Sequence, residues 1–203
     1  MKQKRTGVTA GWLSSLLLMS FFLLGVFGGI ACADCAASHV SGELSAYLSA
    51  YLDASAQREV SLFGICILAL AYFWGPLPAF LLGFAAAGVF LLPLLAALCG
   101  FFPAYAAACL IAAFGNRGIL AAVSFFGLRC LIVIPCFFIL AVPSWRAAAA
   151  RLRAFSGRVR HAGEDSQNRW MCFAGVCLIL TVGVCADLRL SPILLHMLLK
   201  QVF

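Results

Sequence analysis

Long uncharged stretches alternate with short charged segments along this chain. Residues 6–33 and 60–116 carry no Asp, Glu, Lys or Arg, residues 118–145 carry only Arg129, and residues 170–186 are again uncharged. A helix needs about 20 apolar residues to cross the hydrocarbon core of a membrane, with about 17 as the practical minimum. The first, third and fourth stretches therefore predict one membrane span each. The second, at 57 residues, has room for two spans or, with almost no connectors, three.

The charged segments predict on which side of the membrane each connection lies. Three of the first five residues are basic, and residues 146–169 carry six arginines against two acids. Basic segments stay in the cytoplasm, so both should lie inside. Residues 34–59, with four acids and one base, should lie outside. An even number of crossings must then fall within 60–116, and two is the even number that fits. The sequence thus predicts five spans, with the N-terminus cytoplasmic and the C-terminus extracytoplasmic.

The composition excludes a soluble globular domain. Hydrophobic residues make up 65% of the chain and charged residues 10%, whereas a soluble domain is about half apolar and a quarter charged. The mean hydropathy is +1.07. We therefore expect a single all-α domain, a bundle of five helices in a lipid bilayer of the cell membrane, with spans at about 11–32, 76–98, 100–116, 119–142 and 169–187. The net charge of +7 reflects the basic cytoplasmic segments and does not indicate a nucleic acid partner.

A cleaved signal peptide is the competing interpretation of the first stretch. A basic start and an apolar run are both present, but the run from Trp12 to Ile30 is longer than the usual signal-peptide core. The residues before Cys32 only faintly resemble a lipidation site. We therefore favour an uncleaved first span.

Three segments should lie outside the hydrocarbon. Residues 42–59 predict an amphipathic surface helix, because Leu and Tyr recur there at helical spacing from position 44 to position 52. This external segment either packs on the spans, which we favour, or docks a partner. Residues 190–203 predict an outer interfacial helix that begins at Ser191-Pro192. Residues 146–168 form a basic cytoplasmic loop, which an anionic leaflet would attract.

Two small motifs lie in or beside the first span. Cys32, Cys35 and His39 are spaced to share one helical face where this span ends. We favour the two cysteines as separate small apolar side chains; a disulfide and a weak metal site that includes His39 are the alternatives. Gly25 and Gly29 form a Gly-x-x-x-Gly motif that allows another helix to approach closely. We expect it to mediate helix packing.

Arg129 is the only charge well inside a predicted span. About ten residues into 119–142, it should lie near the midplane of the bilayer, where no predicted span offers it an acid. Either its side chain extends to the outer surface as a tolerated passenger, or it faces the bundle interior and serves the function. We predict the second. With no Asp, Glu or His in the spans and no recognised catalytic motif, we expect no enzyme activity and no cofactor.

Several short motifs resemble the stage II sporulation protein M family. They are Gly88 to Pro93 followed by Gly100-Phe101, Phe114 to Leu120, Ile134-Pro135, and Gly183 with Asp187 and Ser191-Pro192. The chain departs from the family pattern at Gly127 to Cys130, where Leu-Pro-Gln-Asn is usual, and at Cys99, where a basic residue is usual. The resemblance implies a hairpin turn near Leu98–Phe101, with 60–75 as an entry segment.

The resemblance also implies a function. It suggests a non-enzymatic scaffold in the mother-cell membrane that anchors peptidoglycan-degrading enzymes, the cell-wall hydrolases, at the septum during endospore engulfment. The alternative is a membrane permease subunit of a transporter, because polytopic proteins without catalytic groups are often permeases. Co-purification of a cell-wall hydrolase would favour the scaffold, whereas an ATPase partner or substrate flux would favour the permease. The sequence predicts no particular oligomeric state.

Overall fold

The computed structural model describes residues 12–35, 62–115, 118–119, 122–155 and 166–202, and these residues form helices joined by short turns. The elements are the N-terminal helix Trp12–Cys35, α2 Leu62–Phe73, α3 Pro76–Leu82, α4 Gly88–Phe114, the π-helical turn η1 Val123–Gly127, α6 Leu128–Phe155 and α7 Ser166–Val202. The all-α prediction is confirmed. Four helices are long and apolar enough to cross a membrane, and a fifth crossing is available if α2 and α3 together form one span.

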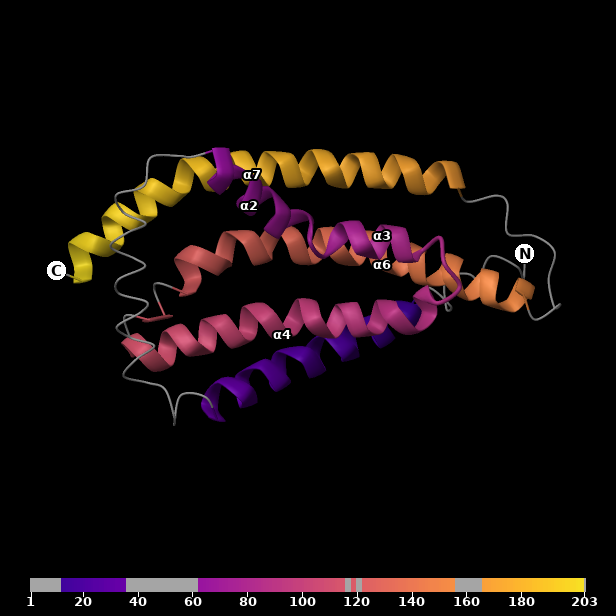
Figure 1. Ribbon diagram of the computed structural model, residues 1–203, viewed down its shortest axis with the longest axis horizontal. Helices are drawn as coiled ribbons and strands as arrows, with labels where there is room; N and C mark the ends of the chain where they lie inside the picture. Colours follow the sequence, from indigo (N-terminus) through magenta and orange to yellow (C-terminus); the bar gives the residue numbers. More distant parts are fainter. Residues whose placement is uncertain (1–11, 36–61, 116–117, 120–121, 156–165, 203) are drawn as a thin grey trace.

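The long helices lie side by side with α6 in the middle of the bundle (Figure 1). One buried cluster joins Leu18 of the N-terminal helix and Leu92 of α4 to Phe137 of α6. A second joins Tyr72 of α2 to α6 and to Leu180 of α7. Many large apolar side chains remain exposed on the outside, as expected for a surface that faces lipid.

The segment α2–α3 is one apolar stretch broken by a bend of 45° at Trp74-Gly75. Pro76 begins α3 and has no N–H to donate to the carbonyl of Tyr72, so the α2 helix cannot continue through it. Gly75 at the bend is buried, and a Cβ there would lie 3.0 Å from the Cys99 sulfur. The bend therefore combines a lost hydrogen bond with a close approach of α4.

The predicted spans 76–98 and 100–116, with their turn near Leu98–Phe101, are wrong. α4 runs unbroken from Gly88 to Phe114, and the turn lies at residues 83–87. Gly100 serves packing instead, because a Cβ there would lie 2.4 Å from the carbonyl oxygen of Phe22. At the real turn, a Cβ on Gly88 would lie 2.1 Å from the Leu82 carbonyl oxygen. The segment 60–116 offers α4 as one crossing, and a second if α2–α3 is one broken span.

The predicted end of the fourth span is also wrong. The described helix continues from Ala122 through η1 and α6 and ends at Phe155, thirteen residues later than the predicted 142. The first ten residues of the expected loop 146–168 are therefore helical, since α6 continues to Phe155. Arginine side chains on this last part of α6 are long enough to reach an interface from within the helix.

The separate tail helix predicted at Ser191 is wrong as well. α7 is one helix of 37 residues that passes through Ser191-Pro192 to Val202. Figure 1 shows it curving toward its C-terminal end, as expected where a proline removes one helical hydrogen bond. The predicted external helix 42–59 lies outside the described residues.

The two ends of the bundle carry different charges. The arginine end, at the right of Figure 1, brings together the α3–α4 turn, the end of α6 and the start of α7, and its described charges are Arg146, Arg151, Arg153 and Arg169. The opposite end carries the end of the N-terminal helix and the start of α6. Both described acids, Asp34 and Asp187, lie there. Arg129 and Arg189 also lie at the opposite end, so the described charges balance there, whereas the arginine end carries four positive charges. An excess of basic residues at one end is what the positive-inside rule predicts for a spanning bundle.

Candidate functional site

Three polar side chains from three helices meet near the opposite end of the bundle. They are Tyr72 on α2, Arg129 on α6 and Asp187 on α7, and together we call them the polar cluster. The guanidinium carbon of Arg129 lies 5.3 Å from the centre of the Tyr72 ring, within the range of a cation–π contact. The Tyr72 side chain is fully buried. The cluster thus places a cation on the face of a buried aromatic ring.

Asp187 supplies the negative charge of the cluster. Its half-buried carboxylate interacts electrostatically with both the Arg129 guanidinium and the Tyr72 hydroxyl. The Tyr72 hydroxyl and the Nε of Arg129 are nevertheless buried without a partner in hydrogen-bonding geometry, and they are the only such side-chain atoms among the described residues. The three groups are therefore held together by charge and ring contacts rather than by a closed hydrogen-bond network.

The fold brings the polar cluster together through antiparallel packing. Arg129 lies in the first turn of α6, directly after η1, whereas Asp187 lies in the C-terminal half of α7. One turn before Asp187, a Cβ on Gly183 would lie 3.1 Å from Tyr72 Cε1 and 3.2 Å from Ile132 Cδ1. The missing side chain at Gly183 therefore lets α7 approach α2 and α6 closely enough for the cluster to form.

The sequence analysis predicted an inward-facing Arg129 but misjudged its surroundings. The guanidinium lies between α2 and α7, within the bundle. It interacts there with Asp187, whereas the sequence analysis expected no acid within reach of it. Asp187 could have been considered, because it lies at the predicted end of the last span.

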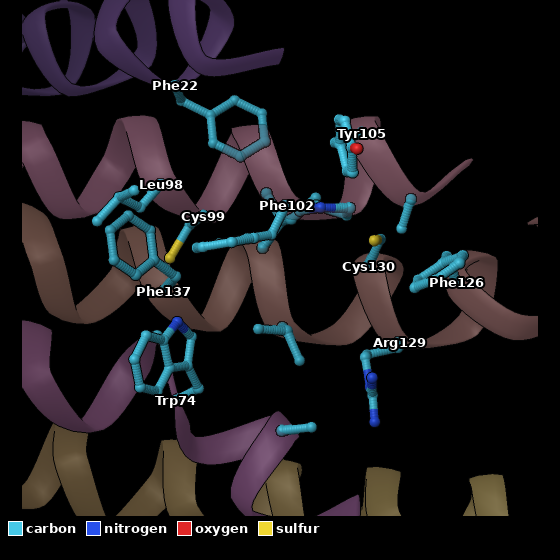
Figure 2. Close-up of a pocket in the computed structure, with 16 residues that line it drawn as sticks. Phe22, Trp74, Leu98, Cys99, Phe102, Tyr105, Phe126, Arg129, Cys130 and Phe137 are labelled. Atoms are coloured by element: carbon cyan, nitrogen blue, oxygen red, sulfur yellow. The ribbon is translucent and has the colours of Figure 1, made fainter. Parts of the chain in front are cut away.

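An apolar cavity of about 350 Å³ adjoins Arg129. It lies between the N-terminal helix, α2, α4 and α6, and its labelled lining residues in Figure 2 are Phe22, Trp74, Leu98, Cys99, Phe102, Tyr105, Phe126, Arg129, Cys130 and Phe137. Figure 2 shows the Arg129 side chain leaving α6 on the side of α2 and α7, away from Phe102 and Tyr105. The cavity therefore offers mainly rings and aliphatic groups, which suit a hydrocarbon chain better than a polar solute.

Of the two motifs in the first span, the structure describes the packing of the glycines but leaves the role of the cysteines untested. A Cβ on Gly25 would lie 2.0 Å from the Ala97 carbonyl oxygen, and one on Gly29 would lie 2.6 Å from the Phe101 carbonyl oxygen, so both glycines lie directly against α4. Cys32 and Cys35 are exposed where the N-terminal helix ends, and His39 lies outside the described residues. No group of three metal-binding side chains occurs within the described part of the chain. The interpretations of Cys32 and Cys35 stay predictions.

Comparison with protein-family models, with curated proteins and with solved structures finds no match for this chain.

Proposed function

We propose that this chain is a non-catalytic, multi-pass membrane scaffold that positions an external partner. In this proposal the arginine end faces the cytoplasm and the polar cluster lies near the extracytoplasmic surface. The charge segregation of the two ends supports this orientation, because basic connections are retained in the cytoplasm. The N-terminal helix, α2–α3, α4, α6 and α7 then cross the membrane five times in alternating directions, which leaves the N-terminus inside and the C-terminus outside.

The extension of α7 beyond its span is the observation that carries the proposal. α7 is 37 residues long, whereas a helix needs about 20–25 residues to cross the hydrocarbon core. At a rise of 1.5 Å per residue, the dozen or so residues in excess add roughly 20 Å to the helix. The polar cluster contacts α7 at Asp187, in the C-terminal half of the helix. A helix that is fixed at its exit and projects outward is what an external partner would need as a docking element.

Peptidoglycan-degrading enzymes are the partners that we propose for this element, acting at the septum during endospore engulfment. Support comes from the motif resemblance to the stage II sporulation protein M family. Two positions of that motif, Gly183 and Asp187, are those that bring α7 against α2 and α6. The motif residues therefore coincide with the contacts that fix the exit of α7.

A permease subunit is the alternative function. A permease for polar solutes needs polar groups along its route, whereas the described cavity is lined mainly by apolar side chains. The polar groups of the cluster interact with one another across three helices. These observations favour a fixed bundle over a solute route.

Crosslinking in sporulating cells, followed by capture of the tagged chain, tests the scaffold. We expect a cell-wall hydrolase to co-purify with the parent and to fall at least tenfold with Arg129→Leu, since that variant loosens α7 at its exit. Arg189→Leu is the matched control, because it removes the same charge from an exposed position at the same end. Recovery of an ATPase in place of a hydrolase, or of no hydrolase above a mock capture, would refute the proposal.

A further inference from the structure

The bend in α2–α3 separates α2 from α4 and leaves the apolar cavity between them. A Cβ on Gly75 would lie 3.0 Å from the Cys99 sulfur, so this segment lies directly against α4 at the bend itself. On one side of the bend α3 packs against α4 and α6, whereas on the other side α2 packs against α7 (Figure 1). The cavity of about 350 Å³ therefore begins at the bend and extends toward the end of the bundle that carries the polar cluster, with α6 as its floor.

The cavity is long and narrow. Its lining runs from Leu98 to Ala106 along α4 and from Arg129 to Phe137 along α6, which at 1.5 Å per residue is roughly 12 Å on each helix. Divided by that length, the volume gives a mean cross-section of about 30 Å². A helix with its side chains is about 10 Å across, which is a cross-section of about 80 Å². The cavity is therefore too narrow for a helix of a partner or of this chain, but it admits a single extended hydrocarbon chain.

The cavity also lies at the depth of one leaflet and opens toward lipid. α2 is 12 residues long, roughly 18 Å, which is close to the hydrocarbon depth of one leaflet at about 15 Å. The bend therefore lies near the middle of the bilayer. Figure 2 shows Trp74, at the bend, at one end of the cavity and Tyr105 at the other. Trp74, Leu98 and Phe102 line the cavity and are exposed large apolar side chains, so lipid can reach it between α2 and α4.

The chemistry of the lining suits hydrocarbon rather than water. Rings and aliphatic groups form most of it, and the Arg129 side chain leaves α6 on the side of α2 and α7 (Figure 2). An apolar cavity of about 150 Å³ stays free of water and binds benzene, so this cavity has room for a larger apolar group. Protein interiors are close-packed and contain few voids larger than a water molecule. A cavity of this size that faces lipid is therefore a site for lipid hydrocarbon.

We propose that the cavity binds one acyl chain of a phospholipid from the leaflet at the end of the polar cluster. The methyl end of the chain lies at the bend, beside Cys99, and its ester end lies near Arg129. The chain fills the space that the bend opens between α2 and α4. This inference goes beyond the scaffold function, because it assigns a ligand to the bundle and holds whichever partner the scaffold binds.

Photocrosslinking of the full-length protein in phosphatidylcholine vesicles tests the proposal with two probes. One phosphatidylcholine carries a diazirine at the methyl end of an acyl chain, and the other carries it beside the ester. Peptide mapping should locate the adducts of the first probe at Cys99 and Phe137, and those of the second at Phe126 and Cys130. Adducts of both probes at the same residues would overturn the proposal. Adducts confined to side chains outside the cavity, such as the exposed Leu94, would overturn it as well, because they would report only the lipid around the bundle.

A variant that fills the cavity sharpens the test. Ala106→Phe places a ring among the lining residues and should lower the adduct yield of the first probe at Cys99 by about fivefold or more, because a close-packed site has no room for both groups. Ala112→Phe is the matched control, since it makes the same change on the same helix at an exposed position outside the cavity, and its yield should stay within about twofold of the parent. Equal yields in the two variants would overturn the proposal. The mapping of the two probes on the parent needs no substitution, so it decides the proposal even where Ala106→Phe fails to fold.

Discussion

The two ends of the bundle use arginine in opposite ways. At the arginine end, Arg151 and Arg169 share a carbonyl and an aromatic ring. At the opposite end, Arg129 lies on an aromatic ring and interacts with Asp187. A group of several arginines suits a membrane surface, where anionic headgroups attract basic residues. A single arginine between helices needs a partner from the protein, and Asp187 is that partner.

Thiol labelling tests directly on which side of the membrane each end of the bundle lies. In a cysteine-free background, single cysteines at Ser49 and Gln57 should react with an impermeant reagent in intact cells. A cysteine at Ser156 should react only after lysis, because residue 156 directly follows the arginine end of α6. Reaction of Ser156→Cys in intact cells would place the arginine end outside the cell and overturn the five-span topology.

Removal of the acid should be the most damaging change to the polar cluster. Asp187→Leu leaves Arg129 charged among α2, α6 and α7, and arginine cannot escape by deprotonation. We expect the free energy of unfolding to fall by about 2 kcal/mol, less than for a fully buried pair, because the Asp187 carboxylate is half-buried. Unfolding of the detergent-purified protein with SDS measures it. The double variant Arg129→Leu with Asp187→Leu should recover most of the loss, and failure to recover would show that the two charges do not interact.

Arg129→Leu should be milder than Asp187→Leu, because the remaining carboxyl can take up a proton. This variant should insert and accumulate normally but should not support hydrolase recruitment. Abundance in membranes and activity in sporulating cells measure the two effects separately. Normal activity would show that Arg129 is tolerated in the span but is not needed for function.

Crowding at Gly183 should separate the helices that form the polar cluster. In Gly183→Leu the new side chain meets Tyr72 and Ile132 at the distances where packing is already tight, so we expect a loss of about 1–3 kcal/mol. Gly175→Leu on the same helix is the control, because no atom lies within 4 Å of its new Cβ, and its effect should stay below about 0.5 kcal/mol. Equal effects would indicate helix propensity rather than packing as the cause.

The smallest effect should come from Tyr72→Phe. This variant keeps the ring beneath Arg129 and removes only a hydroxyl that has no partner in hydrogen-bonding geometry. We expect a change in unfolding free energy within about 0.5 kcal/mol. A loss above about 1.5 kcal/mol, measured in the same SDS assay, would show that the hydroxyl forms a direct bond to Asp187.

The sequence predicted the apolar helices but not where the helices turn. Within the 57 uncharged residues 60–116, hydropathy is high throughout and cannot distinguish a turn from a helix interior. Packing determines where the turn lies, because Gly100 lies against the N-terminal helix and Gly88 lies against the end of α3. Such contacts join residues far apart in the chain, and only the fold brings them together.

The sequence predicted only one residue of the candidate site, and the same reason explains why it missed the other two. Arg129 stood out because a charge within an apolar stretch is costly. Tyr72 looked like any other aromatic residue in an apolar run, and Asp187 looked like the first residue outside the last span. Their role depends on the close approach of α7 at Gly183, which no local pattern indicates.

The break in α2–α3 affects how the chain is assembled during synthesis. Its two pieces, Gly64–Phe73 and Pro76–Leu82, are each too short to cross a bilayer alone. α2 packs against α7 and α3 packs against α6, and both partners leave the ribosome later than the broken span. The second membrane segment along the chain is therefore among the last to be completed during synthesis. In a cysteine-free background, a nascent chain that carries Tyr72→Cys and is arrested before Ser166 should therefore react with an alkylating reagent. Release of the full chain should protect this cysteine, because residue 72 is fully buried against α6 and α7.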